Sequence, residues 1–296
     1  MSVVFRNAEA RSKIEAAYER FRARLPETSS RMVKTRKGET HVLRAGNRSG
    51  PPLLLVHGAI ASSAHATVEL GPLLDRYDVH AVDVIGQSVK SADDRLVLEG
   101  TECGDWLTDV LDGLELERPH VYGISWGGFL SRKLAERSPH RIDHLVLLVP
   151  AGFVNGSFWA GFKNVYWPMT MYRKFPSPER LERFTRAMTS TFDPMWNEYF
   201  GEALLAYNMD MRFPPLAKPE DLAAFKRPTL VFGADQDYSF PGDKLIARVK
   251  AVLPHAEVEL IENCRHAPPT DAVFRKKMAD RIGAFLETSV PADATA

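Results

Sequence analysis

The sequence HVYGISWGGFL at residues 120–130 contains the pattern Gly-x-Ser-x-Gly, with Ser125 at its centre. A β-branched and aromatic run precedes the serine and a helix-forming run follows it, so we expect a strand, a sharp turn and a helix. Side chains at positions 123 and 127 would clash with such a turn, which explains both glycines. The turn projects the Ser125 hydroxyl above a sheet, and the amides of the helix that begins near Trp126 point at it. We therefore predict a nucleophilic serine; the competing interpretation is a serine that caps the helix.

Strand-like and helix-like segments alternate on both sides of this turn. Apolar and β-branched runs predict strands at residues 31–36, 40–45, 53–56, 79–82, 121–124, 145–149, 229–232 and 258–261. Helical spacing predicts helices at residues 67–75, 101–114, 127–137, 242–252 and 271–287, after an N-terminal helix with Ile14, Tyr18, Phe21 and Leu25 on one stripe. The class is α/β, because such alternation produces a mostly parallel central sheet with helices on both faces.

Residues 151–220 interrupt the alternation. They hold 15 of the 29 aromatic residues and 6 of the 9 methionines, in short helical segments separated by prolines. We expect a helical cap inserted over the carboxyl ends of the strands, where such sheets place their active sites. The predicted domains are the core in two parts, 1–150 and 221–296, with the cap between them; the polar tail from residue 289 is expected to be disordered. Four cap residues are candidates for the wall of an apolar pocket, although we expect most of them to be core between cap and sheet and only a minority to face the site: Trp159, Trp167, Tyr172 and Trp196.

The composition excludes several classes of function. The 38 basic and 38 acidic residues cancel, which predicts no affinity of the whole chain for nucleic acid or an anionic membrane. No apolar run reaches about 18 residues and the N-terminus lacks the features of a signal peptide, so we expect a cytoplasmic protein without a membrane span. The two cysteines, Cys103 and Cys264, lack metal-binding spacing. Cys264 lies two residues before a histidine, but we expect a buried thiol rather than a nucleophile.

A second segment is suited to binding the oxyanion that forms in an acyl-transfer reaction. The expected strand 53–56 runs into His57-Gly58-Ala59-Ile60, a loop whose backbone amide would face the serine. The amides of Ala59 and Trp126 would then supply two donors for a tetrahedral oxyanion. Either Ala59 or Ile60 is compatible with the first donor, and His57 is expected to hold the loop rather than to react.

The base and the acid follow the last two expected strands. His266, in ENCRHAPPTD, would lie at the same sheet edge as Ser125 and could take its proton; the alternative is a solvated loop histidine. The strand 229–232 leads into GADQDYSFP, where Asp235 and Asp237 are candidates for the carboxylate that orients the imidazole. The order Ser, Asp, His is that of the α/β-hydrolase fold.

These motifs resemble the α/β-hydrolase superfamily over almost the full chain, in VHGAI, AVDVIGQS, YGISWGG, FGADQDYSFP and NCRHAPPTD. The stretch from Tyr77 to Phe158 is similar to bacterial carboxylesterases of the naproxen-esterase type. The resemblance implies serine carboxylesterase activity, a helical cap, and no cofactor or metal. It favours Asp237 as the acid, because the spacing to Pro241 is the usual one, while Asp235 stays open.

Three positions depart from the family pattern. Gln236 occupies the usual position of the acid, and AVDVIGQS lacks the second glycine of a loop that shapes the pocket wall. Asp271, five residues after the histidine, is expected to cap a helix.

The expected function is hydrolysis of a small carboxylic ester, with a small-molecule ester as partner and an acyl-enzyme intermediate on Ser125. A carbon–carbon bond hydrolase, a lactonase or an aminopeptidase would use the same triad, because the fold hosts all of these activities. The alternative outside the enzymes is a catalytically inactive protein of this fold that binds a ligand. The sequence does not indicate an oligomeric state.

Overall fold

The computed structural model describes residues 2–290, so the predicted disorder of the tail lies mostly outside the described residues. Eight strands of this range form one sheet in the order β1-β2-β4-β3-β5-β6-β7-β8. Their bounds are β1 Ser29–Thr35, β2 Gly38–Gly46, β3 Pro52–Val56, β4 Asp78–Val82, β5 His120–Ile124, β6 Leu145–Leu148, β7 Thr229–Ala234 and β8 Glu257–Ile261. β2 is antiparallel to β1 and β4, and the remaining pairs are parallel. The predicted α/β class with a mostly parallel sheet is confirmed.

The helices connect these strands and cover both faces of the sheet. The helices outside the segment 151–220 are α1 Ala8–Arg22, α2 Ser63–Glu69, α3 Glu102–Leu114, α4 Trp126–Arg137, α9 Gly242–Val252 and α10 Ala272–Leu286, with short 3₁₀ turns η1 Gly71–Asp75 and η2 Pro139–Arg141. A further 3₁₀ turn, η4 Pro219–Leu222, spans the end of that segment. The helix expected at 67–75 is wrong in its bounds. It begins earlier, after Ser62, whose side chain caps it, and it ends at Glu69. Gly71, with a φ of +53°, and the following proline then impose the separate 3₁₀ turn.

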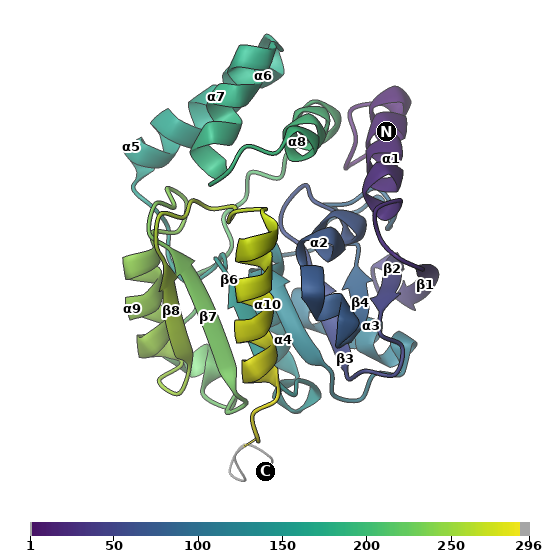
Figure 1. Ribbon diagram of the computed structural model, residues 1–296, viewed down its shortest axis with the longest axis vertical. Helices are drawn as coiled ribbons and strands as arrows, with labels where there is room; N and C mark the ends of the chain where they lie inside the picture. Colours follow the sequence, from purple (N-terminus) through teal and green to yellow (C-terminus); the bar gives the residue numbers. More distant parts are fainter. Residues whose placement is uncertain (1, 291–296) are drawn as a thin grey trace.

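Alternation of side chains along the strands divides the core into two layers. Leu53 and Leu55 of β3 pack with residues of α2, η1 and α10, whereas Leu54 and Val56 pack with residues of α3, α4 and α9. Successive strand residues point to opposite faces, so a strand covered on both sides is apolar throughout. Figure 1 shows the result, with α10 in front of the sheet and α4 behind it.

The segment 151–220, here called the insert, lies between β6 and β7. Its helices are α5 Phe158–Gly161, the π-helical turn η3 Phe162–Tyr166, α6 Trp167–Lys174, α7 Pro178–Met188 and α8 Pro194–Ala206. They stand above the carboxyl ends of the strands in Figure 1, with α1 beside α8. An ion pair of 2.7 Å between Arg20 of α1 and Glu202 of α8 joins these two helices.

Candidate active site

Ser125 occupies a strained turn between β5 and α4. Its φ of 52° and ψ of −111° lie where a residue with a side chain is rarely found, at a cost of about 1–3 kcal/mol. The two flanking glycines make the turn possible. A Cβ at Gly123 would lie 2.4 Å from the Oγ of Ser131, and a Cβ at Gly127 would lie 2.0 Å from the carbonyl oxygen of Val56. The sequence pattern thus reflects two close approaches of the backbone to its neighbours.

Two hydrogen bonds connect Ser125 to the loops that follow β7 and β8. The Nε2 of His266 lies 2.9 Å from the Oγ of Ser125, and its Nδ1 lies 2.7 Å from the Oδ2 of Asp237. Three predicted side chains that are far apart in the sequence therefore meet at one sheet edge. With Nδ1–H donating to the carboxylate, Nε2 is free to accept the proton of the hydroxyl.

The two candidate aspartates have different hydrogen-bond partners. Asp237 is 4% exposed and its second oxygen accepts the N–H of Ser239 at 2.7 Å. Asp235 is exposed, and its carboxylate accepts the N–H groups of Asn263 and Cys264 at 3.0 and 2.8 Å. Asp235 therefore supports the loop that carries the histidine, while Asp237 contacts the imidazole.

The carboxylate also changes the basicity of the imidazole. Burial by itself lowers the pKa of His266, but the Asp237 carboxylate outweighs burial and raises this pKa above its ordinary value of 6.5. Burial would raise the pKa of Asp237, yet His266 and the backbone N–H groups that it accepts lower this pKa overall. Asp237 is therefore ionised near neutral pH. Burial raises the pKa of the Cys264 thiol to about 11, as suits the buried thiol that we expected.

The loop after β3 lies against the serine. A Cβ at Gly58 would be 3.4 Å from the Cβ of Ser125, so this residue is in close contact with the turn. The N–H of Ile60 donates to the side-chain oxygen of Gln87 at 3.1 Å, which leaves it unavailable to a substrate. Within residues 2–290, the amides of Ala59 and Trp126 have no acceptor. Of the two residues left open by the sequence, Ala59 is therefore the one with an unused donor.

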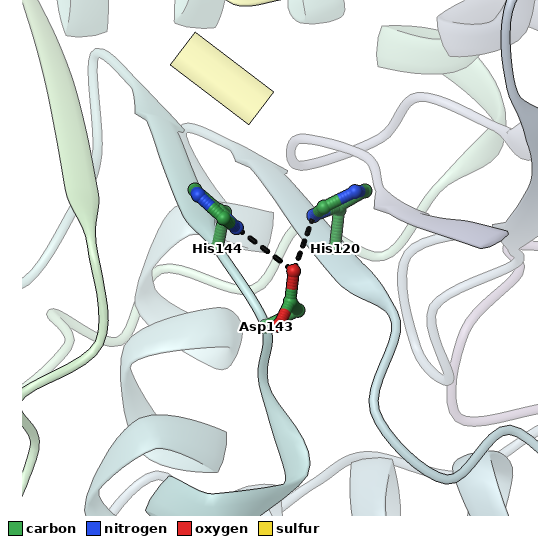
Figure 2. Close-up of side chains that lie close together, drawn as sticks. All are labelled: His120, Asp143 and His144. Carbon is green, nitrogen blue, oxygen red and sulfur yellow. Dashed lines mark hydrogen bonds and ion pairs between the residues drawn. The ribbon is translucent and has the colours of Figure 1, made fainter. Parts of the chain in front are cut away.

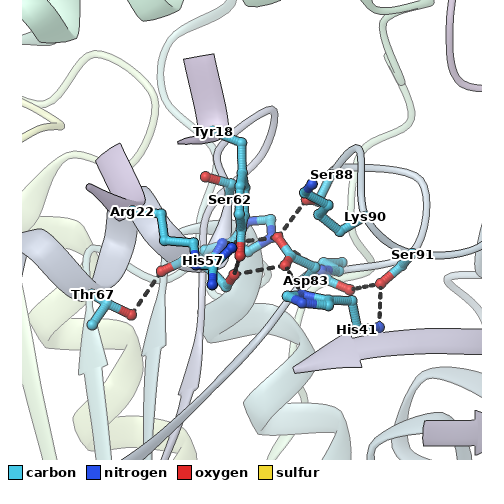
Figure 3. Close-up of polar contacts among 12 residues, drawn as sticks. Tyr18, Arg22, His41, His57, Ser62, Thr67, Asp83, Ser88, Lys90 and Ser91 are labelled. Carbon is cyan, nitrogen blue, oxygen red and sulfur yellow. Dashed lines mark hydrogen bonds and ion pairs between the residues drawn. The ribbon is translucent and has the colours of Figure 1, made fainter. Parts of the chain in front are cut away.

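A buried polar network supports this loop. The Nδ1 of His57 lies 2.7 Å from the carbonyl oxygen of Gly58, and its Nε2 accepts the N–H of Val84 at 3.0 Å, which defines the tautomer. Asp83 is completely buried between His41, with Nδ1 at 2.7 Å, and the serine hydroxyls of residues 63 and 88. Figure 3 shows this carboxylate beside His57. His57 thus holds the loop, as the sequence indicated.

A cavity of about 290 Å³ opens beside Ser125 and His266. Its wall is mainly apolar and includes Ile124, Leu148, Val165, Met169, Phe184 and Phe200. One charged pair interrupts it, with the carboxylate of Glu69 at 2.8 Å from the guanidinium of Arg275. The indole N–H of Trp196 donates to the same carboxylate at 2.8 Å, so this contact also links α8 of the insert to α2 of the core.

A family model described as the alpha/beta hydrolase fold matches residues 51–272. The chain belongs to the alpha/beta hydrolase fold family. The resemblance seen in the sequence is confirmed by this match, which spans the segments carrying Ser125, Asp237 and His266.

Relatives in this alpha/beta hydrolase family include carboxylesterases of Bacillus subtilis. Carboxylesterase YbfK is 23% identical over 273 residues, which cover 90% of this chain and 91% of that protein. A second protein, described as uncharacterized carboxylesterase nap, is 25% identical over 244 residues, or 79% of each chain. The crystal structure of naproxen esterase from the same organism has a TM-score of 0.81 at 23% identity, covering 95% of this chain and 99% of that one. This structure shares the fold of the chain.

Two expectations about the pocket wall of this alpha/beta hydrolase are wrong. Trp196 lines the cavity, but Trp159 and Trp167 are 75% and 46% exposed, and Tyr172 is buried in the core away from it. The segment AVDVIGQS contributes no cavity-lining residue among the described ones; it supports the loop of Ala59 through Gln87. Sequence reasoning missed that support, although a polar residue beside a buried strand end was the available signal.

One group of side chains in residues 2–290 lies close enough together to hold a metal ion, namely His120, Asp143 and His144, with ligand atoms within 4.8 Å of one another (Figure 2). The group lies at the amino ends of β5 and β6, opposite to Ser125. The carboxylate already has the Nδ1 of His144 at 2.9 Å and pairs with the guanidinium of Arg227. A metal ion would therefore compete with a positive charge that is in place.

None of the helices in the described part of the chain combines the length and the apolar character needed to cross a bilayer.

Proposed function

We propose that the chain is a serine carboxylesterase whose insert forms a cap over the active site. The observation that carries this proposal is the continuous chain of hydrogen bonds from the Oγ of Ser125 through His266 to Asp237. An isolated serine hydroxyl is a poor nucleophile, and an imidazole held by a buried carboxylate is the usual means of activating it. The similarity to two carboxylesterases, over 79% and 90% of this chain, supports the same activity.

In the proposed reaction, Ser125 attacks the ester carbonyl while His266 accepts its proton. The amides of Ala59 and Trp126 bind the oxyanion of the tetrahedral intermediate, each contributing about 3–4 kcal/mol to the transition state. The protonated His266 then gives its proton to the departing alcohol, leaving an acyl group on the serine. Water, activated by the same imidazole, releases the acid and restores the hydroxyl.

The cavity wall favours a small-molecule ester with one apolar portion. Its volume of about 290 Å³ accommodates an acyl or alcohol group of moderate size, and most of the side chains around it offer no hydrogen bond. The Glu69–Arg275 pair satisfies its own charges, so it does not call for a charged substrate.

Hydrolysis of p-nitrophenyl acetate and butyrate tests the proposal. We expect turnover by the wild type and none by Ser125→Ala. Ser49→Ala, which changes an exposed serine on a surface turn, is the matched control and should keep full activity. Undiminished turnover by Ser125→Ala would refute the assignment. A panel with a lactone, an aminoacyl anilide and a vinylogous diketone separates an esterase from the other hydrolases of this fold.

A further inference from the structure

The insert exposes an unusual amount of aromatic surface. Phe158, Trp159, Tyr166 and Trp167 are 73%, 75%, 43% and 46% exposed. Large apolar patches are rare on the surface of a water-soluble monomer, because each ring costs free energy in contact with water. These residues lie on α5, η3 and the start of α6, which follow one another in the insert, with α5 at its lower left in Figure 1.

The exposed rings form one continuous surface. Phe162 lies in the middle, with its ring centroid 6.2 Å from that of Phe158, 6.4 Å from Trp159, 5.7 Å from Tyr166 and 6.2 Å from Trp167. We call these five residues the aromatic ridge. Residues 158, 162 and 166 are spaced four apart, which places them along one side of a helical segment.

The segment that carries the ridge is basic, whereas the adjacent helix α7 carries charges of both signs. Residues 158–175 contain Lys163, Arg173 and Lys174 and no acidic residue, in a chain that is neutral overall. Lys163 and Lys174 are exposed, and neither has a carboxylate partner among the described residues. Tryptophan and tyrosine beside lysines that have no carboxylate partner are typical of surfaces that enter the interface between lipid and water, where the rings meet the acyl boundary and the ammonium groups meet anionic headgroups.

The segment that carries the ridge also contributes to the wall of the cavity. Val165 and Met169, four residues apart, are part of the cavity wall that also includes Ser125. A surface bound to the ridge would therefore contact the same helical segment that forms part of the cavity wall.

We propose that the aromatic ridge docks the chain onto an anionic lipid surface. Lipophilic esters held in that surface would then enter the nearby cavity. Docking is independent of catalysis, whereas the delivery of esters rests on the proposed carboxylesterase function. The neutral net charge of the chain predicted no such affinity, because it averages over a local excess of basic residues.

Binding to vesicles tests the docking. The full chain is mixed with vesicles of phosphatidylcholine alone, or with one third phosphatidylglycerol, and the bound fraction is measured by sedimentation. We expect binding to the anionic vesicles, a blue shift of tryptophan emission, and weakening by salt. The double variant Lys163→Glu/Lys174→Glu should bind about 25-fold more weakly or worse, since each basic group near an anionic surface contributes about fivefold. Phe158→Ser/Trp159→Ser should lose about tenfold or more through the lost apolar contact.

Matched controls lie on the strand β1, far from the insert. Met32→Ser removes an apolar side chain that is 47% exposed, and Lys34→Glu reverses an exposed lysine. Both should bind vesicles as the wild type does. Retained hydrolysis of p-nitrophenyl acetate by the ridge variants shows that they are folded, and vesicle binding by Ser125→Ala separates docking from catalysis.

Two results would overturn the proposal. One is the absence of wild-type binding to anionic vesicles at low salt. The other is a wild-type dimer in sedimentation velocity that Phe158→Ser/Trp159→Ser converts to a monomer without any change in vesicle binding, because the ridge would then be an interface between two copies of the chain.

Discussion

Replacement of Gln87, which does not line the cavity, by leucine should disturb the loop of residues 57–60, whose Ala59 amide is proposed to bind the oxyanion. Gln87 is 3% exposed, and its side-chain oxygen accepts the N–H of Ile60 at 3.1 Å. Leucine has a similar volume but no acceptor, so the buried N–H would stay unpaired at a cost of about 1–3 kcal/mol. Ile60 also has a φ of 50°, a left-handed conformation that costs a further 1–2 kcal/mol, approximately, for a residue with a side chain.

These two costs decide the expected size of the effect. Together they disfavour the observed loop by about 2–5 kcal/mol, and relaxation of Ile60 would turn the adjacent Ala59 amide away from the oxyanion. One such donor is worth about 2.7–4 kcal/mol, which limits the loss in kcat to roughly 10²–10³-fold. KM should change by less than about threefold, because the donor acts on charge that develops in the transition state.

Steady-state hydrolysis of p-nitrophenyl butyrate gives kcat and KM for Gln87→Leu and for Gln87→Glu. The second variant keeps an acceptor oxygen on a side chain of the same length and should recover most of the loss. Thermal unfolding of both variants separates a local change in the loop from a general loss of stability. A Gln87→Leu enzyme with kcat within twofold of the wild type would refute the reasoning.

Asp237→Asn should lower kcat by about 10⁴-fold, because an amide favours the wrong imidazole tautomer. Asp235→Asn should lower kcat by less than about tenfold. Equal losses of kcat in the two variants would contradict the different roles assigned to these residues. In the wild type, kcat/KM should fall as the pH drops through the raised pKa of His266, with a midpoint above 6.5, because a protonated imidazole cannot accept the serine proton. In Asp237→Asn that midpoint should move to lower pH, because the carboxylate that raises the pKa is gone; a pH profile that does not move would argue against this cause. Gly127→Ala should destabilise the fold by about 3 kcal/mol, or roughly 6–12 °C in Tm, since its Cβ would lie 2.0 Å from a carbonyl oxygen of β3. Gly161→Ala, where the added Cβ meets nothing within 4 Å, is the control that calorimetry should find unchanged or more stable.

The central elements of the fold could be predicted because their signals are local. A run such as Leu53–Val56 can only be a buried strand or part of a buried helix, and its length and its position before a glycine favour the strand. Ser125 and His266 were predictable for a related reason. In a parallel sheet the carboxyl ends of all strands lie at one edge, so residues that follow different strands are brought together by topology alone.

Tertiary structure decided what local patterns leave undetermined. Asp235 and Asp237 are two residues apart in one turn, and the path of that turn determines which carboxylate reaches the imidazole and which supports the loop of residue 264. The support of Ile60 by Gln87 joins two loops 27 residues apart, so no periodicity encodes it.

The sequence by itself determined the strands, most helices of the core and the turn at Ser125, because these depend on residues that are close together in the chain. It also indicated that the aromatic-rich insert consists of short helical segments. Only the tertiary structure decided that Trp196 faces the cavity while Trp159 and Trp167 face outward. The physical reason is that a helix aromatic on several sides has no preferred inner face until another element packs against it.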